Sequence, residues 1–351
     1  MTSASFTVPS ASGFAARRIA RLGLAGVSLV LHLAATACDD SPSETAASGS
    51  SGAGANGGIG GEGNASAVGG FGGAGGGAGA GGGRGCGTAR PDLHSVTGTL
   101  GMVIARDGTI YYSQGDSVGR LQPGGTPDDS WLTIDLATIW ALALDADNTH
   151  LFVSDVDAGH IRIVDLTASA PTAESFVFPA ITARFMTVGP DGALYYSDDA
   201  AETVFRVPLG GTTGTPTAVT TTPVFALGGI AFSSDGSALL VASGTTIYQL
   251  ALTDGVETAR TPVAMTEGGA TGLALDVDGR LYVTTRAQFG KLVRFEADGS
   301  GLTELLDNID EVNAVEFGAG ALDCHDVYVT AIGEMRRYEM GIAPGAPVPW
   351  H

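Results

Sequence analysis

"GPDGALYYSDDAAETVFRVPLGG", residues 189–211, holds two short strands between turn signals. A Pro-Asp-Gly turn precedes an alternating apolar strand, Ala193 to Ser197, and Asp and Gly are residues that tight turns favour. Acidic and small residues separate this strand from a second one, Thr203 to Val207, and a Gly-Gly pair ends the stretch. The pattern predicts a β-hairpin that begins and ends in turns.

The same unit recurs along the chain at a nearly constant interval. Its Asp-Gly or Asp-Asn turns are spaced by 40, 44, 44 and 43 residues, and they begin at Asp107, Asp147, Asp191, Asp235 and Asp278. One further step of similar length reaches Asp323. Repeats with a fixed period of about 40–50 residues are typical of a β-propeller. Six units therefore predict an all-β fold, a six-bladed β-propeller.

Each unit has the order of strands that a propeller blade needs. A short apolar strand comes first, the turn follows, and the second strand is rich in aromatic and β-branched residues: TIYYS, HLFVS, ALYYS, ALLVA, RLYVT and DVYVT. A third strand and a weaker fourth strand complete a twisted, four-stranded blade. The first strands are apolar at nearly every position, which indicates burial on both faces near the axis of the ring.

Blade six is different, because its unit supplies only three strands before the chain continues as GIAPGAPVPWH. An unassigned strand candidate, Leu93 to Thr97, precedes unit one. We expect it to be the outermost strand of blade six, so that the ring closes and leaves only short, protected edges. The propeller domain is then predicted over residues 86–343, with a C-terminal tail over residues 344–351.

Residues 1–37 have the pattern of a secretory signal peptide. Three arginines precede a mostly apolar run, residues 22–37, which is shorter than the about 20 residues that a membrane-spanning helix needs. The run ends in AATAC, which resembles the lipobox of bacterial lipoproteins, and this resemblance implies that Cys38 carries a lipid. We therefore expect an exported bacterial lipoprotein, anchored to a periplasm-facing membrane or at the cell surface. The sequence leaves the choice of membrane open.

Residues 38–85 begin with that cysteine and consist almost entirely of Gly, Ala and Ser. Such a segment cannot bury enough apolar surface to offset its ordering entropy, so we expect a disordered tether with a reach of roughly 35–40 Å. The net charge of −20 argues against a nucleic-acid partner, because binding phosphates needs clustered cations. The expected partners are a membrane, through the lipid, and an unidentified protein, glycan or small molecule, and we expect a monomer.

The chain has three cysteines, and lipidation of Cys38 leaves Cys86 and Cys324. Cys86 lies just before the expected closing strand, and Cys324 lies in the turn between the first two strands of blade six. These two places are at the same end of a four-stranded blade, and an exported protein folds in an oxidising compartment. We predict a Cys86–Cys324 disulfide; the alternative is a pair of buried, unpaired thiols.

Six blades built on this unit resemble the regucalcin–gluconolactonase family, which includes luciferin-regenerating enzymes and is described together with NHL-repeat propellers. The most specific part is the end, VNAVEFGAGALDCHDVYVTAIGEMRRYEMGIAPGAPVPW, residues 312–350. The resemblance implies one divalent metal over the central channel and hydrolysis of lactones or phosphoesters. It also implies a set of Glu, Asn and Asp ligands at the starts of the first strands.

At the matching positions, this chain has lost those ligands. Leu100 stands where the family has Glu, Arg184 and Phe185 stand at an Asn and an Asp, Gly228 replaces an Asn, and Thr271 replaces an Asp. Leu, Phe and Gly side chains supply no oxygen to a hard cation. No cofactor is therefore predicted, and calcium or zinc would need other ligands. The aspartate pairs in DVDG and DADN are read as hairpin turns rather than as a calcium loop.

The residues expected at the mouth of the channel are Trp140, Arg184, Phe185, Thr271 and Asn313. An aromatic ring beside an arginine suits recognition of a sugar or a carboxylate, although Trp140 and Phe185 could equally fill the wide end of the ring. We interpret the protein as a tethered binding or scaffold module for a protein, glycan or small molecule. The alternative is a divergent gluconolactonase-like, metal-dependent lactone or ester hydrolase with a rebuilt site. The sequence assigns no catalytic residue.

Overall fold

The structure is a computed structural model, and it describes residues 87–91, 93, 96, 100–133, 138–179, 182–211, 213–276, 278–286, 289–331 and 333–340. Every described residue belongs to one compact unit, residues 75–351. This part of the chain contains 23 strands and no helix, so it offers no helix that could cross a membrane. The predicted signal peptide, Cys38, the tether and the tail after residue 343 lie outside the described residues.

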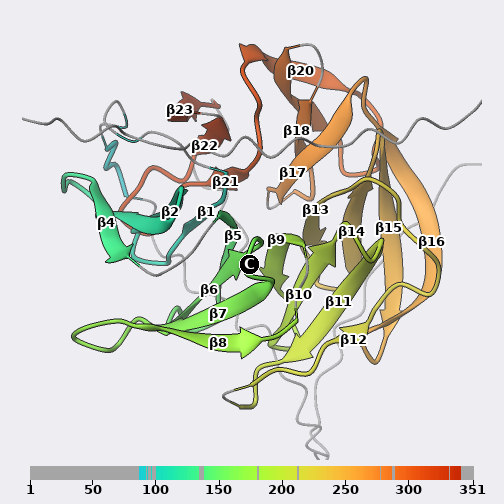
Figure 1. The fold of residues 1–351 in the computed structure, drawn as a ribbon. Helices are drawn as coiled ribbons and strands as arrows, with labels where there is room; N and C mark the ends of the chain where they lie inside the picture. The colour runs from blue at the N-terminus through green and yellow to red at the C-terminus, as the bar shows by residue number, and fades with distance from the viewer. Residues whose placement is uncertain are drawn as a thin grey trace, which may run out of the picture. The chain divides into compact units, whose positions relative to one another are not determined.

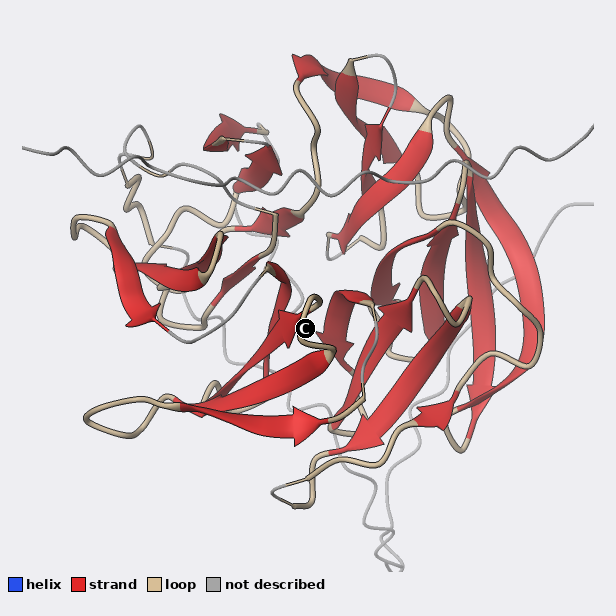
Figure 2. Ribbon diagram, in the orientation of Figure 1, coloured by secondary structure: helices blue, strands red, loops and turns tan. Residues whose placement is uncertain are grey.

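The strands form six antiparallel sheets around a central axis (Figure 1, Figure 2). Neighbouring innermost strands contact each other all the way round, and the contact between the first and the last of them closes the ring. The innermost strands are β1 (Met102–Ile104), β5 (Ile139–Leu144), β9 (Ala183–Val188), β13 (Leu227–Phe232), β17 (Gly269–Leu275) and β21 (Val315–Phe317). The all-β, six-bladed propeller predicted from the repeat is confirmed.

The remaining strands follow outward in chain order within each blade. The second strands are β2 (Ile110–Gln114), β6 (His150–Asp155), β10 (Ala193–Asp198), β14 (Ala238–Ser243), β18 (Leu281–Arg286) and β22 (Asp326–Ala331). The third strands are β3 (Ser117–Leu121), β7 (His160–Asp165), β11 (Thr203–Pro208), β15 (Thr246–Thr253), β19 (Gly290–Phe295) and β23 (Glu334–Glu339). The outermost strands are β4 (Asp128–Thr133), β8 (Ala173–Val177), β12 (Thr217–Ala218), β16 (Val256–Met265) and β20 (Thr303–Ile309).

The repeated turns have the backbone conformation that their residues favour. In five blades the residue after the turn aspartate has a positive φ: Gly108, Asn148, Gly192, Gly236 and Gly279. Glycine and asparagine reach this left-handed region at the lowest steric cost, which explains why the repeat keeps them there. Both aspartate pairs that resemble fragments of a calcium loop, DADN and DVDG, lie in these turns.

Large aromatic side chains pack between the blades. Tyr195 on the second strand of blade three meets Phe232 of blade four edge to face, with ring centroids 4.9 Å apart. Tyr282 of blade five meets Phe317 of blade six in the same way at 4.8 Å. Each aromatic side chain buries about 150–250 Å², so the aromatic positions of the repeat supply much of the contact that holds adjacent blades together.

The segment before β1 lies against blade six, as expected. Ala89 forms a parallel bridge with Leu322, and Arg90 pairs with Asp323 at 3.0 Å. Leu93 and Val96 are buried and belong to the same apolar cluster as Met335 of β23. Within the described residues, blade six has three strands. The other residues of the predicted strand Leu93 to Thr97 are not described, so its strand conformation stays a prediction.

Cys324 is disulfide-bonded. The predicted partner, Cys86, lies outside the described residues, so the pairing stays a prediction. It is supported by the backbone next to it, because the Gly87 N–H donates to the carbonyl of Gly320 at 2.9 Å and the Ala89 N–H donates to that of Ala321 at 3.0 Å.

The Cys86→Ser and Cys324→Ser variants should each have a lower free energy of unfolding, by the same amount in both. The bond closes a loop of more than 230 residues, and the chain-entropy model gives roughly 4–5 kcal/mol for such a loop. Denaturant unfolding measures the loss, and mass spectrometry of a non-reduced digest should contain the linked peptide. Cys38→Ser is the matched control and should keep both the linked peptide and the stability. A digest without a peptide linking Cys86 to Cys324 contradicts the pairing.

Candidate functional site

The innermost strands start at one mouth of the central channel, and four of them are irregular there. Their pairing with the second strands shifts register at Trp140, Arg184, Gly228 and Thr271, in blades two to five. Such β-bulges bend a strand and re-aim its side chains, and they are common beside functional sites. The positions that the family resemblance assigns to metal ligands in blades three to five therefore fall on, or next to, bulges at the mouth.

Hydroxyl groups hold these strand starts in place. The Ser113 hydroxyl accepts hydrogen bonds from the backbone N–H groups of Leu100 and Gly101, both at 2.9 Å. Thr284 and Thr330 accept from Gly272 and Ala314 in the same way, at 2.7 and 2.9 Å. These hydroxyls come from the Ser or Thr that ends the second-strand motif of the repeat. They satisfy backbone N–H groups at the strand starts, and the one that Thr284 binds, Gly272, lies in the bulge of blade five.

A cavity of about 210 Å³ opens at this mouth. We call it the mouth cavity; its polar and aromatic lining residues are Trp140, Arg184, Phe185, Asp199, Thr271 and Arg286. Four of the five residues predicted at the mouth line it together. The fifth, Asn313, lies behind Arg286. The structure thus brings four of the predicted residues to one cavity, which Asp199 and Arg286 also line, and the binding role of this cavity stays a prediction.

Arg184 and Trp140 lie next to each other in the wall of the mouth cavity. The Arg184 guanidinium carbon lies 4.2 Å from the centroid of the Trp140 ring, which is a cation–π contact. Its Nη1 atom lies 3.5 Å from Asp199 Oδ2, and both side chains are about one third exposed. At this exposure the ion pair is weak. The guanidinium is thus held in place while part of it still faces the cavity.

Arg286 supplies a second cation from the end of β18, and it is exposed. Its Nη2 atom donates to Asn313 Oδ1, and the Asn313 amide donates in turn to the Glu311 carbonyl at 2.9 Å. No carboxylate of the described residues forms an ion pair with Arg286, so its remaining N–H groups are available to a ligand. The sequence could have indicated Arg286 as a mouth residue. The second strand of a blade runs antiparallel to the first, so its last residue returns to the mouth at which the first strand starts.

The side chains of Thr271 and Asn313 form hydrogen bonds within the protein and so have a structural role at the mouth. Thr271 is buried, and its hydroxyl lies 2.9 Å from the Thr284 hydroxyl and 3.0 Å from the Val312 carbonyl. It joins blades five and six. Asn313 is also buried and orients Arg286. Phe185 packs partly against the core of blades three and four, so the space-filling interpretation holds for part of its ring.

The mouth does not suit the metal that the family resemblance implies. Leu100 lines the channel just below the mouth, and the described residues contain no group of three or more His, Cys, Asp or Glu side chains that could hold a metal ion. A Cβ atom at Gly228 would collide with the Ala270 carbonyl oxygen, so the present backbone has no room for an amide ligand there. Among the described residues, the one carboxylate at the mouth, Asp199, is paired with Arg184, and the Thr271 hydroxyl is engaged within the protein, so the mouth falls far short of the six to eight oxygen ligands that calcium takes.

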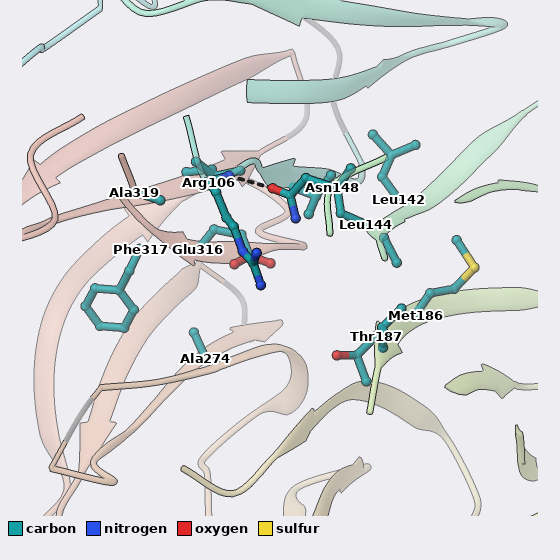
Figure 3. A pocket seen from close by; sticks show the side chains of 15 residues that line it. Arg106, Leu142, Leu144, Asn148, Met186, Thr187, Ala274, Glu316, Phe317 and Ala319 are labelled. Atoms are coloured by element: carbon teal, nitrogen blue, oxygen red, sulfur yellow. Dashed lines mark hydrogen bonds between the residues drawn. The ribbon is translucent and has the colours of Figure 1, made fainter. Parts of the chain in front are cut away.

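Glu316 on β21 is the carboxylate of the channel interior. Val315 and Phe317 face the apolar core between blades five and six, so the alternation of the strand turns Glu316 toward the axis. It lines two small cavities of the channel, of about 60 and 70 Å³. Figure 3 shows the larger one, with Glu316 and Arg106 among its lining residues. No hydrogen bond or ion pair to Glu316 is found among the described residues. The side chain is half-buried, and desolvation of the carboxyl raises its pKa to about 8.

The sequence analysis did not identify Glu316, although a charged residue inside an otherwise apolar first strand could have indicated it. The first strand of each repeat is expected to be buried on both faces, and a carboxylate inside such a strand is unusual. The strand AVEFG of unit six carries one.

Comparison with solved structures gives the same fold. A gluconolactonase from Xanthomonas campestris matches with a TM-score of 0.57 and 19% identity, over 69% of this chain and 86% of that one. The calcium-binding protein regucalcin from Agrobacterium tumefaciens matches with a TM-score of 0.57 and 16% identity, over 76% and 96%. A luciferin-regenerating enzyme matches with a TM-score of 0.56 and 17% identity, over 72% and 94%. The chain has the six-bladed fold of these proteins.

No family model and no curated protein matches the sequence. The fold that the predicted resemblance to the regucalcin–gluconolactonase family implies is confirmed by the solved structures.

Dialysed protein should contain no stoichiometric calcium, zinc or manganese, and adding each ion back should leave the melting temperature unchanged. A bound ion at 100 times its dissociation constant would stabilise the fold by about 2.7 kcal/mol, which a thermal melt resolves easily. Elemental analysis and differential scanning fluorimetry are the measurements. One metal per chain after dialysis, or a clear shift with a single ion, would overturn the conclusion that the mouth lacks a metal site.

Proposed function

We propose that the chain is a divergent, gluconolactonase-like hydrolase that takes a small hydroxylated carboxylic acid ester, such as a sugar lactone, at the mouth cavity. The observation that carries this proposal is the meeting of Arg184, Arg286 and Asp199 around Trp140 at the end of the propeller channel. The likeness to a gluconolactonase supports the chemical class. The site differs from the family pattern because it is built without the metal ligands.

Each element of the mouth cavity suits such a ligand. Guanidinium groups form charge-assisted hydrogen bonds with carboxylates and carbonyl oxygens. The Asp199 carboxylate accepts hydrogen bonds from hydroxyl groups, and the Trp140 ring offers a flat apolar face to the C–H groups of a sugar ring. A volume of about 210 Å³ favours a compact ligand over a polymer.

A binding module without turnover is the second candidate. Leu100 and Gly228 remove ligands on which a metal-dependent hydrolase relies, and this loss favours recognition alone. The same mouth and the same ligand class serve both roles, so the measurement of hydrolysis separates them. Within either role, we propose that the protein is exported and anchored through Cys38, and that it acts as a monomer.

The Arg184→Gln and Arg286→Gln variants should each weaken binding of gluconate and its lactone by about 10-fold or more. Hydrogen bonds to charged groups contribute about 1.5–3 kcal/mol, and each variant removes one charged donor. Isothermal calorimetry on the full-length protein is the measurement. Arg120→Gln is the matched control, because Arg120 also lies over a tryptophan, Trp131, and near Asp128, but on the outer strands of blade one.

Arg120→Gln should bind as the unmodified protein does. Binding that survives both mouth variants places the ligand elsewhere. Absence of binding by the unmodified protein to any sugar acid or lactone rejects the proposed function.

Cys38→Ser should release the protein from the membrane fraction of a bacterial host. Cell fractionation and metabolic labelling with a clickable fatty acid are the measurements, and Cys86→Ser is the control, since it should keep the label. An unlabelled parent protein contradicts the lipid anchor.

A further inference from the structure

Glu316 is a channel carboxyl with no partner among the described residues, below the cavity where the ligand would bind. Resting on the function proposed above, we propose that Glu316 is the general base, and then the general acid, of lactone hydrolysis inside the channel. Nothing in the family resemblance assigns a role to this position.

The geometry connects Glu316 to the mouth. Trp140, Arg184 and Phe185 line the mouth cavity, and the same three residues line the smaller cavity below it, which Glu316 also lines. A ligand held by Arg286 at the rim therefore reaches inward along a wall that leads to the carboxyl. The smaller cavity measures about 60 Å³, which exceeds the about 10–15 Å³ that one water molecule needs. A water molecule fits between the ligand and Glu316.

The surroundings make Glu316 a stronger base than an exposed carboxylate. Two charged side chains line the same cavities: Arg184, from β9, and Arg106, from the turn after β1. No ion pair joins either one to Glu316 among the described residues. The facing strands β5, β13 and β17 present Leu142, Ile230 and Ala274 and no titratable group. Burial raises the pKa of Glu316 to about 8, and a base is most effective when its pKa lies near the working pH.

The reaction needs only water. The Glu316 carboxylate takes a proton from the water, and the water oxygen bonds to the ester carbonyl carbon. The negative charge that develops on the carbonyl oxygen faces the Arg184 guanidinium, as an oxyanion-stabilising group must. The ring C–O bond then breaks, and the leaving oxygen takes the proton back from Glu316. The product is the open hydroxy acid, and the carboxylate is regenerated without any oxidation or reduction.

The test is the pH profile of lactone opening by the full-length protein, with the uncatalysed rate subtracted. The value of kcat/KM for gluconolactone should rise with pH and level off above about pH 8, as Glu316 ionises. Glu316→Gln should lower kcat by about 10²–10⁴-fold, remove the rise and leave calorimetric binding of gluconate unchanged. Glu174→Gln is the matched control, since Glu174 is exposed on the outer strand β8, and it should keep the profile.

Stability against pH gives a readout that does not depend on activity. The pKa of Glu316 is raised from its ordinary 4.5 to about 8 in the fold. Between these values the unfolded chain has lost the proton that the folded chain keeps, so the free energy of unfolding falls as pH rises through this window. Glu316→Gln should remove this contribution and become relatively more stable than the parent at pH 8.

The outcomes separate the two proposals. Hydrolysis that Glu316→Gln retains with its pH profile overturns the role of Glu316 and leaves the proposed function standing. Binding without hydrolysis overturns this inference and leaves the binding module. Absence of both binding and hydrolysis rejects the proposed function itself.

Discussion

The close approach of neighbouring inner strands at the mouth is the contact on which the rest of the site depends. A Cβ atom at Gly101 would lie 2.6 Å from the Trp140 carbonyl oxygen, and one at Gly272 would lie 2.6 Å from that of Asn313. Atoms do not approach so closely, so glycine is required where each backbone meets the next. The inner ring is therefore narrow, and the two cavities inside it have room for only a few water molecules. Only one end of a ligand bound at the mouth would fit into the channel.

This narrowness sets the electrostatics of the site. The chain has a net charge of −20, but exposed charges more than about 8 Å apart are largely screened at physiological ionic strength. A ligand at the mouth therefore responds to the two nearby arginines rather than to the overall charge. Inside the channel, protein replaces the water that would hydrate a carboxylate, so Glu316 holds its proton more tightly. The same ring thus places two arginines at its rim and a carboxyl with a raised pKa beneath them.

The repeat was sufficient to predict the fold because each strand signal is local. The aromatic second strands and the Asp-Gly turns follow from alternation and backbone angles, and the structure places them as expected. Trp140, Arg184 and Thr271 were located because they lie at the starts of the first strands. Arg286 and Glu316 were missed, because one comes from the far end of a second strand and the other from the middle of a first strand. Arg286 lines the mouth cavity and Glu316 lines the smaller cavities below it, and how these cavities adjoin depends on strand register and on the bulges.

The replacements at the family's metal positions are consistent with one another. A metal ion in a hydrolase supplies positive charge that polarises a carbonyl and stabilises the oxyanion. Arg184 occupies the start of a first strand, where the family resemblance implies a ligand to that ion, and its guanidinium brings a fixed positive charge to the same mouth. A hard cation is held by several oxygen ligands together, so an arginine at one ligand position weakens the site both by removing a donor and by repelling the cation. Packing accounts for the other two positions, since a Cβ atom at Gly228 would collide with the Ala270 carbonyl oxygen and the Thr271 hydroxyl joins blades five and six. In the proposed hydrolase, the proton transfer that a metal-bound water would assist is assigned to Glu316.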